Sequence, residues 1–189
     1  MLQVGNLRGP LAAVESRTHF GAWCIVSSPL VLGMDLTNET TMGAVWPYIS
    51  NAEAVQVNQR WAGDPGRLLN LSSSTADPAA VKAAAKEKAK AKAKAKAPAV
   101  EVWAKLQPSG AVALLAINTD ATASSAETSV DLAAVWPQGM MPAEWCRSKP
   151  CAIRDIWKQE SGGQTGADHV WHVGALVPHD SAFVLVSPS

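Results

Sequence analysis

The chain has 189 residues, 48% of them hydrophobic, and its formal net charge at pH 7 is zero. That length can hold one or two compact domains, but a complete barrel of eight βα units needs about 250 residues. The charge balance gives no global basic field of the kind that binds nucleic acid. No apolar run approaches the roughly 20 residues of a membrane span, and no signal peptide precedes the first element. If the true start lies upstream, the last observation says nothing about localisation.

The first third of the chain alternates helical and strand patterns. Residues 11–28 have helical apolar spacing that ends at Pro29. Residues 30–34 (LVLGM) form a continuous apolar run, typical of a strand that is covered on both faces. Short helices are then expected over 39–46, before Pro47, and over 51–58, with Asn51 as the cap of the second. This order of elements predicts α/β structure.

After residue 66 the pattern changes to strands. Residues 99–104 and 111–118 flank the turn 107–110 and predict a hairpin. Further strands are expected over 128–132, 152–157, 168–173 and 182–186, with Gly162 and Gly163 among the residues that separate them. Several short strands without long helices between them predict an antiparallel sandwich.

Residues 73–98 interrupt the strands with a low-complexity Ala/Lys insertion. Residues 82–96 contain seven lysines and a single acid, Glu87, so the rest of the chain is mildly acidic. The alternation leaves no apolar stripe to bury, which favours a solvated loop or a frayed helix. The alternative is a patch that binds an anionic polymer or surface.

The chain has three cysteines and two glycosylation sequons. Cys24 lies in an apolar run and is expected to be a buried free thiol. Cys146 and Cys151 are close enough in sequence to pair across a short loop, or they are two unrelated thiols. The sequons are at Asn38 and Asn70. Such triplets also occur by chance, so they are only weak support for a secretory route.

A series of short motifs runs along the chain in a fixed order. The N-terminal ones are Met1–Asn6 (MLQVGN), 17–23 (RTHFGAW), 28–36 (SPLVLGMDL) and 49–59 (ISNAEAVQVNQ). The later ones are 101–103 (EVW), 113–118 (ALLAIN), 153–157 (IRDIW) and 178–180 (PHD). Together they resemble the C-terminal part of glycoside hydrolase family 27, the α-galactosidases, starting inside that family's Asp-Pro-Asp-Met-Leu motif.

The resemblance implies an α/β plus all-β fold: the end of a (β/α)8 TIM barrel followed by an antiparallel β-sandwich. Residues 1–64 would supply the loop after barrel strand 7, helix 7, strand 8 and helix 8. Residues 65–189 would form the C-terminal β domain, with 73–98 as an insertion. The resemblance also implies a secreted, lysosomal or vacuolar enzyme that needs no cofactor, acts on α-galactosides, and binds neither nucleic acid nor membranes. A homo-oligomer is left open.

Retaining glycosidases need two carboxylates about 5–5.5 Å apart at the C-terminal face of the barrel. The two aspartates that serve this role in the family follow barrel strands 4 and 6, and neither has a counterpart here. No catalytic residue is therefore assigned, and the chain alone is expected to be inactive. Asp35, at the end of the expected strand 8, is interpreted as structural. The resemblance makes Met1 a residue of the galactose pocket, although it is also the first residue of the chain.

Other chemistries have weaker support in the sequence. The four histidines are widely spread and do not show zinc-ligand spacing, so no metal site is predicted. Three functional readings remain. The first is an α-galactosidase of which this chain carries the non-catalytic C-terminal portion. The second is a non-catalytic, carbohydrate-associated β-sandwich module or a truncated inactive homologue. The third is a partner subunit whose lysine run docks on an acidic surface.

Overall fold

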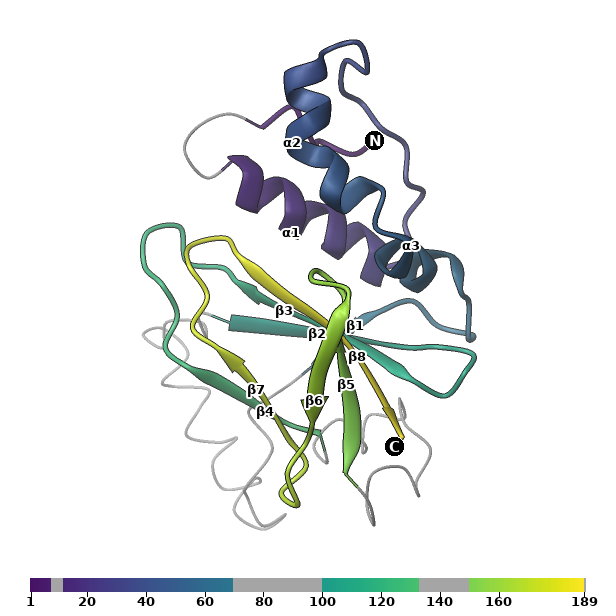
Figure 1. The fold of residues 1–189 in the computed structure, drawn as a ribbon, viewed down its shortest axis with the longest axis vertical. Helices are drawn as coiled ribbons and strands as arrows, with labels where there is room; N and C mark the ends of the chain where they lie inside the picture. Colours follow the sequence, from purple (N-terminus) through teal and green to yellow (C-terminus); the bar gives the residue numbers. More distant parts are fainter. Residues whose placement is uncertain (8–11, 70–99, 133–149, 189) are drawn as a thin grey trace, which may run out of the picture.

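The computed structural model describes residues 1–7, 12–69, 100–132 and 150–188. These residues form a helical layer, a six-stranded sheet and a two-stranded sheet, with the helices over one face of the larger sheet (Figure 1). The expected insertion at 73–98 lies outside the described residues.

The helical layer contains three helices, α1 (Ala12–Ile25), α2 (Glu39–Ile49) and α3 (Ala52–Gln59). Asn38 and Asn51 cap the second and third, because each side chain accepts a hydrogen bond from a backbone N–H of the first helical turn. The predicted helices are confirmed, but the expected end of α2 before Pro47 is wrong. Pro47 lies inside the last turn, where its missing N–H forfeits only one intrahelical bond.

The larger sheet is antiparallel throughout and has the strand order β1-β2-β3-β8-β5-β6. Its strands are β1 (Arg67–Leu68), β2 (Val100–Leu106), β3 (Val112–Asn118), β5 (Cys151–Asp155), β6 (Glu160–Gln164) and β8 (Ser181–Pro188). The smaller sheet pairs β4 (Thr128–Asp131) with β7 (Val170–Gly174). The predicted hairpin is β2–β3, and the antiparallel sandwich-like arrangement is confirmed.

Two strands were not predicted. β1 has only two residues, too few for a periodic pattern. β6 contains Gly162 and Gly163, which the sequence indicated as a separator. All five of its residues are exposed at the edge of the sheet, and its pairing with β5 is irregular. An edge strand of this kind buries no side chains, so it needs no apolar residues.

The sheet carries a core on each face. Leu114, Val184 and Trp171 belong to the core between the two sheets. The adjacent residues Leu115 and Phe183 point the other way and join the core shared with the helices. Successive side chains of a strand face opposite sides, so a strand that is covered on both faces is apolar throughout. This explains the continuous apolar run of β3.

The residues expected to form the last strand of a barrel do not form a strand in this structure. Residues 30–34 form no strand; an isolated parallel bridge joins Leu32 to Leu2. Val31 is 52% exposed and Leu32 36% exposed, so the expected burial of this run on both faces is wrong. Within the described residues, no further strand lies beside this bridge to cover these side chains.

Lys105 is a fully buried charged residue on β2. Its ammonium group donates hydrogen bonds to the backbone carbonyls of Val57 and, at 3.2 Å, Asn58. These carbonyls lie in the last turn of α3, where the helix leaves acceptors unpaired and the helix dipole favours a cation. Burial lowers the pKa of Lys105, while the Cys24 thiol acts in the opposite direction.

We expect Lys105→Met to reduce the free energy of unfolding by about 1–3 kcal/mol, because it leaves the α3 carbonyls buried without a donor. The matched control is Lys158→Met, which removes an exposed lysine with only long ion pairs. Urea unfolding of both variants measures the difference. Equal stability of the two variants would contradict the capping role of Lys105.

Candidate functional site

The N-terminal segment lies beside residues 31–34. The Leu2 N–H donates to the Val31 carbonyl at 2.8 Å, and the Asn6 side-chain amide donates to the Gly33 carbonyl at 3.0 Å. A Cβ at Gly33 would lie 2.5 Å from the Met1 sulfur and 3.0 Å from the Leu2 carbonyl oxygen. A larger residue would have to displace the Met1 side chain and would crowd the Leu2 carbonyl, so glycine suits this approach of the two segments. Met1 is 69% exposed at the edge of this contact.

Asp35 follows the Leu2–Leu32 bridge. Its carboxylate accepts hydrogen bonds from the Thr37 N–H at 2.9 Å and the Thr37 hydroxyl at 2.7 Å. These hydrogen bonds hold the pKa of Asp35 below its ordinary value. The geometry supports a structural role, because Asp35 closes the turn before Asn38, and it is Asn38 that caps α2.

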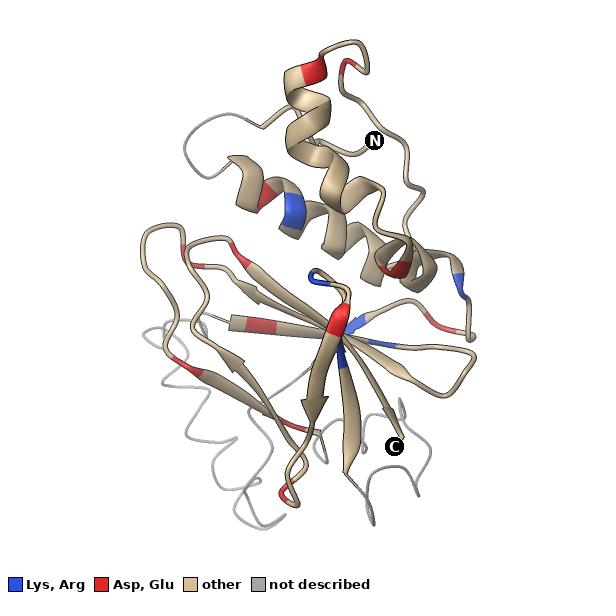
Figure 2. Cartoon of the chain, in the orientation of Figure 1, with Lys and Arg blue, Asp and Glu red and all other residues tan. Residues whose placement is uncertain are grey.

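Several acids of the described residues form ion pairs with basic side chains. Ion pairs join Asp180 to Arg17, Glu53 to Arg154, Asp155 to Lys158, and Asp64 to Arg67. The described residues also contain no group of three or more His, Cys, Asp or Glu that could hold a metal ion. Figure 2 shows acidic and basic positions in the helical layer and in the sheet alike.

The cysteines and sequons are only partly placed. Cys24 is confirmed as a buried free thiol, and burial raises its pKa to about 12. Cys151 is buried at the start of β5, whereas Cys146 lies outside the described residues. No disulfide lies wholly within the described part of the chain. Asn38 is exposed, and Asn70 is also outside the described residues.

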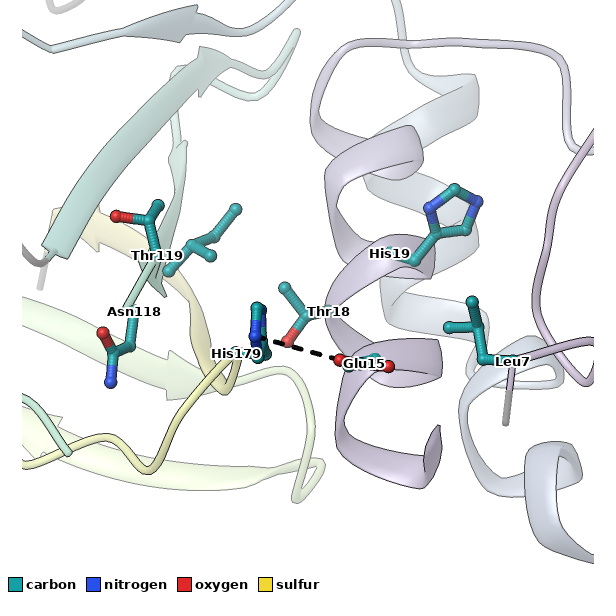
Figure 3. A pocket seen from close by; sticks show the side chains of 8 residues that line it. Leu7, Glu15, Thr18, His19, Asn118, Thr119 and His179 are labelled. Carbon is teal, nitrogen blue, oxygen red and sulfur yellow. Dashed lines mark ion pairs between the residues drawn. The ribbon is translucent and has the colours of Figure 1, made fainter. Parts of the chain in front are cut away.

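The fold forms a pocket of about 470 Å³ between the helical layer and the sheet. Glu15, Thr18 and His19 line it from α1, residues 117–119 from the end of β3, and His179 from the loop before β8. Figure 3 shows Glu15 and His179 facing each other across it. No sequence spacing joins His19 to His179, because they lie 160 positions apart in the chain and only the docking of α1 on the sheet brings them to one pocket.

Beside this pocket, several polar contacts fasten α1 to the sheet. Arg17 pairs with Asp180, and the Thr18 hydroxyl donates to the Ser181 hydroxyl at 2.9 Å. His19 accepts a hydrogen bond from the Gln3 N–H at 3.2 Å through Nε2. One turn of α1 therefore binds both the β8 region and the N-terminal segment.

No described helix is both long and apolar enough to cross a membrane.

The comparisons with known proteins point to one group. Residues 97–186 match the model of the alpha galactosidase C-terminal beta sandwich domain. The chain is 39% identical to the α-galactosidase of Coffea arabica over 66 residues, which are 35% of this chain and 16% of that protein. It is 22% identical to a probable α-galactosidase of Dictyostelium discoideum, over all of this chain and 39% of that protein.

Solved structures give the same picture of the fold. α-Galactosidase I from Mortierella vinacea aligns with all of this chain and 38% of its own length, with a TM-score of 0.71 and 21% identity. The α-galactosidase MEL1 from Saccharomyces cerevisiae aligns with all of this chain and 46% of its own length, with a TM-score of 0.69 and 15% identity.

These matches define a class of fold, a C-terminal β-sandwich domain that resembles that of the α-galactosidases. The chain resembles the C-terminal part of the glycoside hydrolase family 27 α-galactosidases, as its motifs predicted. It spans less than half the length of the relatives and solved structures described above.

His19 makes stability depend on pH. Burial, and secondarily the N-terminal amine, lower the pKa of His19 from 6.5. The folded state therefore favours the neutral ring, and the unfolded state binds the proton more readily. This contribution to stability is present above pH 6.5 and is lost as the pH falls through the folded-state pKa.

We expect the His19→Gln variant to lose less stability than the wild type when the pH falls from 7.5 to 5. Glutamine can still accept the Gln3 N–H but does not titrate. Urea midpoints at the two pH values measure the effect, with His172→Gln, on the exposed side of β7, as the control. The same pH dependence in the wild type and in both variants would exclude His19 as its source.

Proposed function

We propose that the chain is the C-terminal, non-catalytic portion of a retaining α-galactosidase. In this proposal residues 1–64 complete the catalytic (β/α)8 barrel, and residues 65–189 form a supporting β domain with an insertion at 73–98. The substrate is a terminal α-galactosyl residue of an oligosaccharide or glycoconjugate. The nucleophile and the acid/base lie in a part of the enzyme that this chain does not contain.

The observation that carries the proposal is the match of residues 97–186 to the α-galactosidase C-terminal domain. It is joined by 39% identity to the coffee α-galactosidase. A β-L-arabinopyranosidase of family 27 from Geobacillus stearothermophilus has a similar fold, with a TM-score of 0.62. We therefore base the choice of galactose as the substrate sugar on the sequence relatives and not on the fold.

The parallel bridge between Leu2 and Leu32 supports the barrel part of the proposal. Parallel strands belong to βα structure, and here α1 connects the two bridged segments. Val31 and Leu32 are exposed beside the bridge, as expected of a sheet fragment whose neighbouring strands lie elsewhere. In this arrangement Met1 would line the galactose pocket.

Two further features follow from the proposal. One is a secretory route, which fits the sequons at Asn38 and Asn70. The other is a disulfide between Cys146 and Cys151. The five-residue spacing and the burial of Cys151, which is not among the free thiols, support this disulfide. Peptide maps with and without reductant test the disulfide, and a free Cys146 thiol would contradict it.

The activity can be tested with two proteins. We expect the 189-residue chain to show no hydrolysis of p-nitrophenyl α-galactoside. A chimera that joins the N-terminal part of the Mortierella vinacea enzyme to this chain, at the structurally aligned junction, is expected to hydrolyse it. The unaltered Mortierella enzyme is the control.

Turnover by the isolated chain that disappears in Asp35→Asn would contradict both the assignment of the catalytic groups and the structural role of Asp35. A folded but inactive chimera would favour the second reading, a carbohydrate-associated module or an inactive homologue.

A further inference from the structure

The pocket between α1 and the sheet is a candidate binding site in this chain. Its polar lining comes from two layers, with Glu15 and Thr18 on α1 and His179 on the loop before β8 (Figure 3). Its volume of about 470 Å³ lies in the range of small-molecule sites.

Glu15 and His179 lie close enough for one hydroxyl group of a ligand to bridge them. Glu15 Oε1 and His179 Nε2 are 3.9 Å apart, which is within ion-pair range but too long for a direct hydrogen bond. Both side chains are about one-third exposed and can be reached from solvent. A hydroxyl both donates and accepts, so it can donate to the carboxylate and accept from an imidazole N–H at the same time.

The remaining polar groups differ in what they can still bind. The donors of the Asn118 amide are fully used, because its nitrogen donates to three backbone carbonyls, and its oxygen already accepts from the Asp120 N–H. The Thr18 hydroxyl donates to Ser181 and keeps its capacity to accept. Glu15, His179 and Thr18 therefore form the binding set, while Asn118 shapes the wall.

The lining also selects the class of ligand. It contains no Lys or Arg, and the Glu15 carboxylate disfavours anions. Among the described residues there is no group of three or more His, Cys, Asp or Glu that could hold a metal ion. Leu7 and Ile117 add apolar surface, which suits the C–H groups of a sugar ring.

We propose that this pocket binds a neutral sugar, with its hydroxyls held by Glu15, His179 and Thr18. All the residues named for this site belong to this chain. It can therefore be tested on the isolated protein, and its failure would leave the proposed function untouched.

Titration of the ¹⁵N-labelled chain with galactose tests the proposal. We expect saturable shifts of the Thr18, Thr119 and His179 amide signals. Glu15→Gln, which removes a charge-assisted acceptor, should weaken binding about tenfold. Its matched control is Glu39→Gln, because both acids lie in the first turn of a helix and only Glu15 faces the pocket.

A second pair of variants tests the other wall. His179 has a φ of 59°, a conformation that Asn tolerates, so His179→Asn should keep the fold and weaken binding. His172→Asn should leave binding unchanged. Galacturonate, an anionic sugar of the same shape, should bind less tightly than galactose.

Three outcomes would overturn the proposal. They are the absence of galactose-dependent shifts up to the solubility of the sugar, binding that is unaffected by both pocket variants, and tighter binding of galacturonate than of galactose.

Discussion

The packing of α1 against the six-stranded sheet is the contact on which the two halves of the molecule depend. Phe20 and Cys24 of α1 share a core with Leu115 and Phe183 of the sheet. Gly21 allows α1 to lie close to the sheet, because a Cβ at this position would lie 2.9 Å from the Trp157 ring and 3.2 Å from Leu115. At the N-terminal end of the interface, Arg17 pairs with Asp180. The helix is thus held by apolar packing along its length and by charge at one end.

Polar contacts also join α3 to the sheet and to the residue that follows β5. The Asn51 amide donates to the Ile156 carbonyl at 2.7 Å while its oxygen caps α3, and Glu53 of the same helix pairs with Arg154. Lys105 closes the other end of α3. The sheet has a second core of its own toward β4 and β7, whereas the helical layer shares its only described core with the sheet. The sheet is therefore the platform and the helices are the dependent layer, which suits a β domain that supports the end of a catalytic barrel.

The sequence predicted most elements because their signals are local. Asn51 identified the start of α3, and the apolar run 111–118 identified a central strand. The prediction of a buried strand over residues 30–34 was wrong. The run has the composition of such a strand, but the described residues contain no neighbouring strands that cover it. β6 was missed because an exposed edge strand needs no apolar residues. The pocket could not be predicted, since Glu15 and His179 meet only after α1 docks. The motifs that include Arg17 and Asp180 indicated the family, but no sequence spacing showed that the two residues form a pair.

Native-state hydrogen exchange tests the dependence of the helical layer on the sheet most directly. The account predicts that the amides of Leu114 and Leu115 in β3 exchange only through global unfolding. The amides of Phe20 and Ala22 in α1 should exchange through a smaller opening of lower free energy. Arg17→Met should speed exchange in α1 and leave β3 unchanged. Greater protection in α1 than in β3, or an equal effect of Arg17→Met on both, would contradict the account.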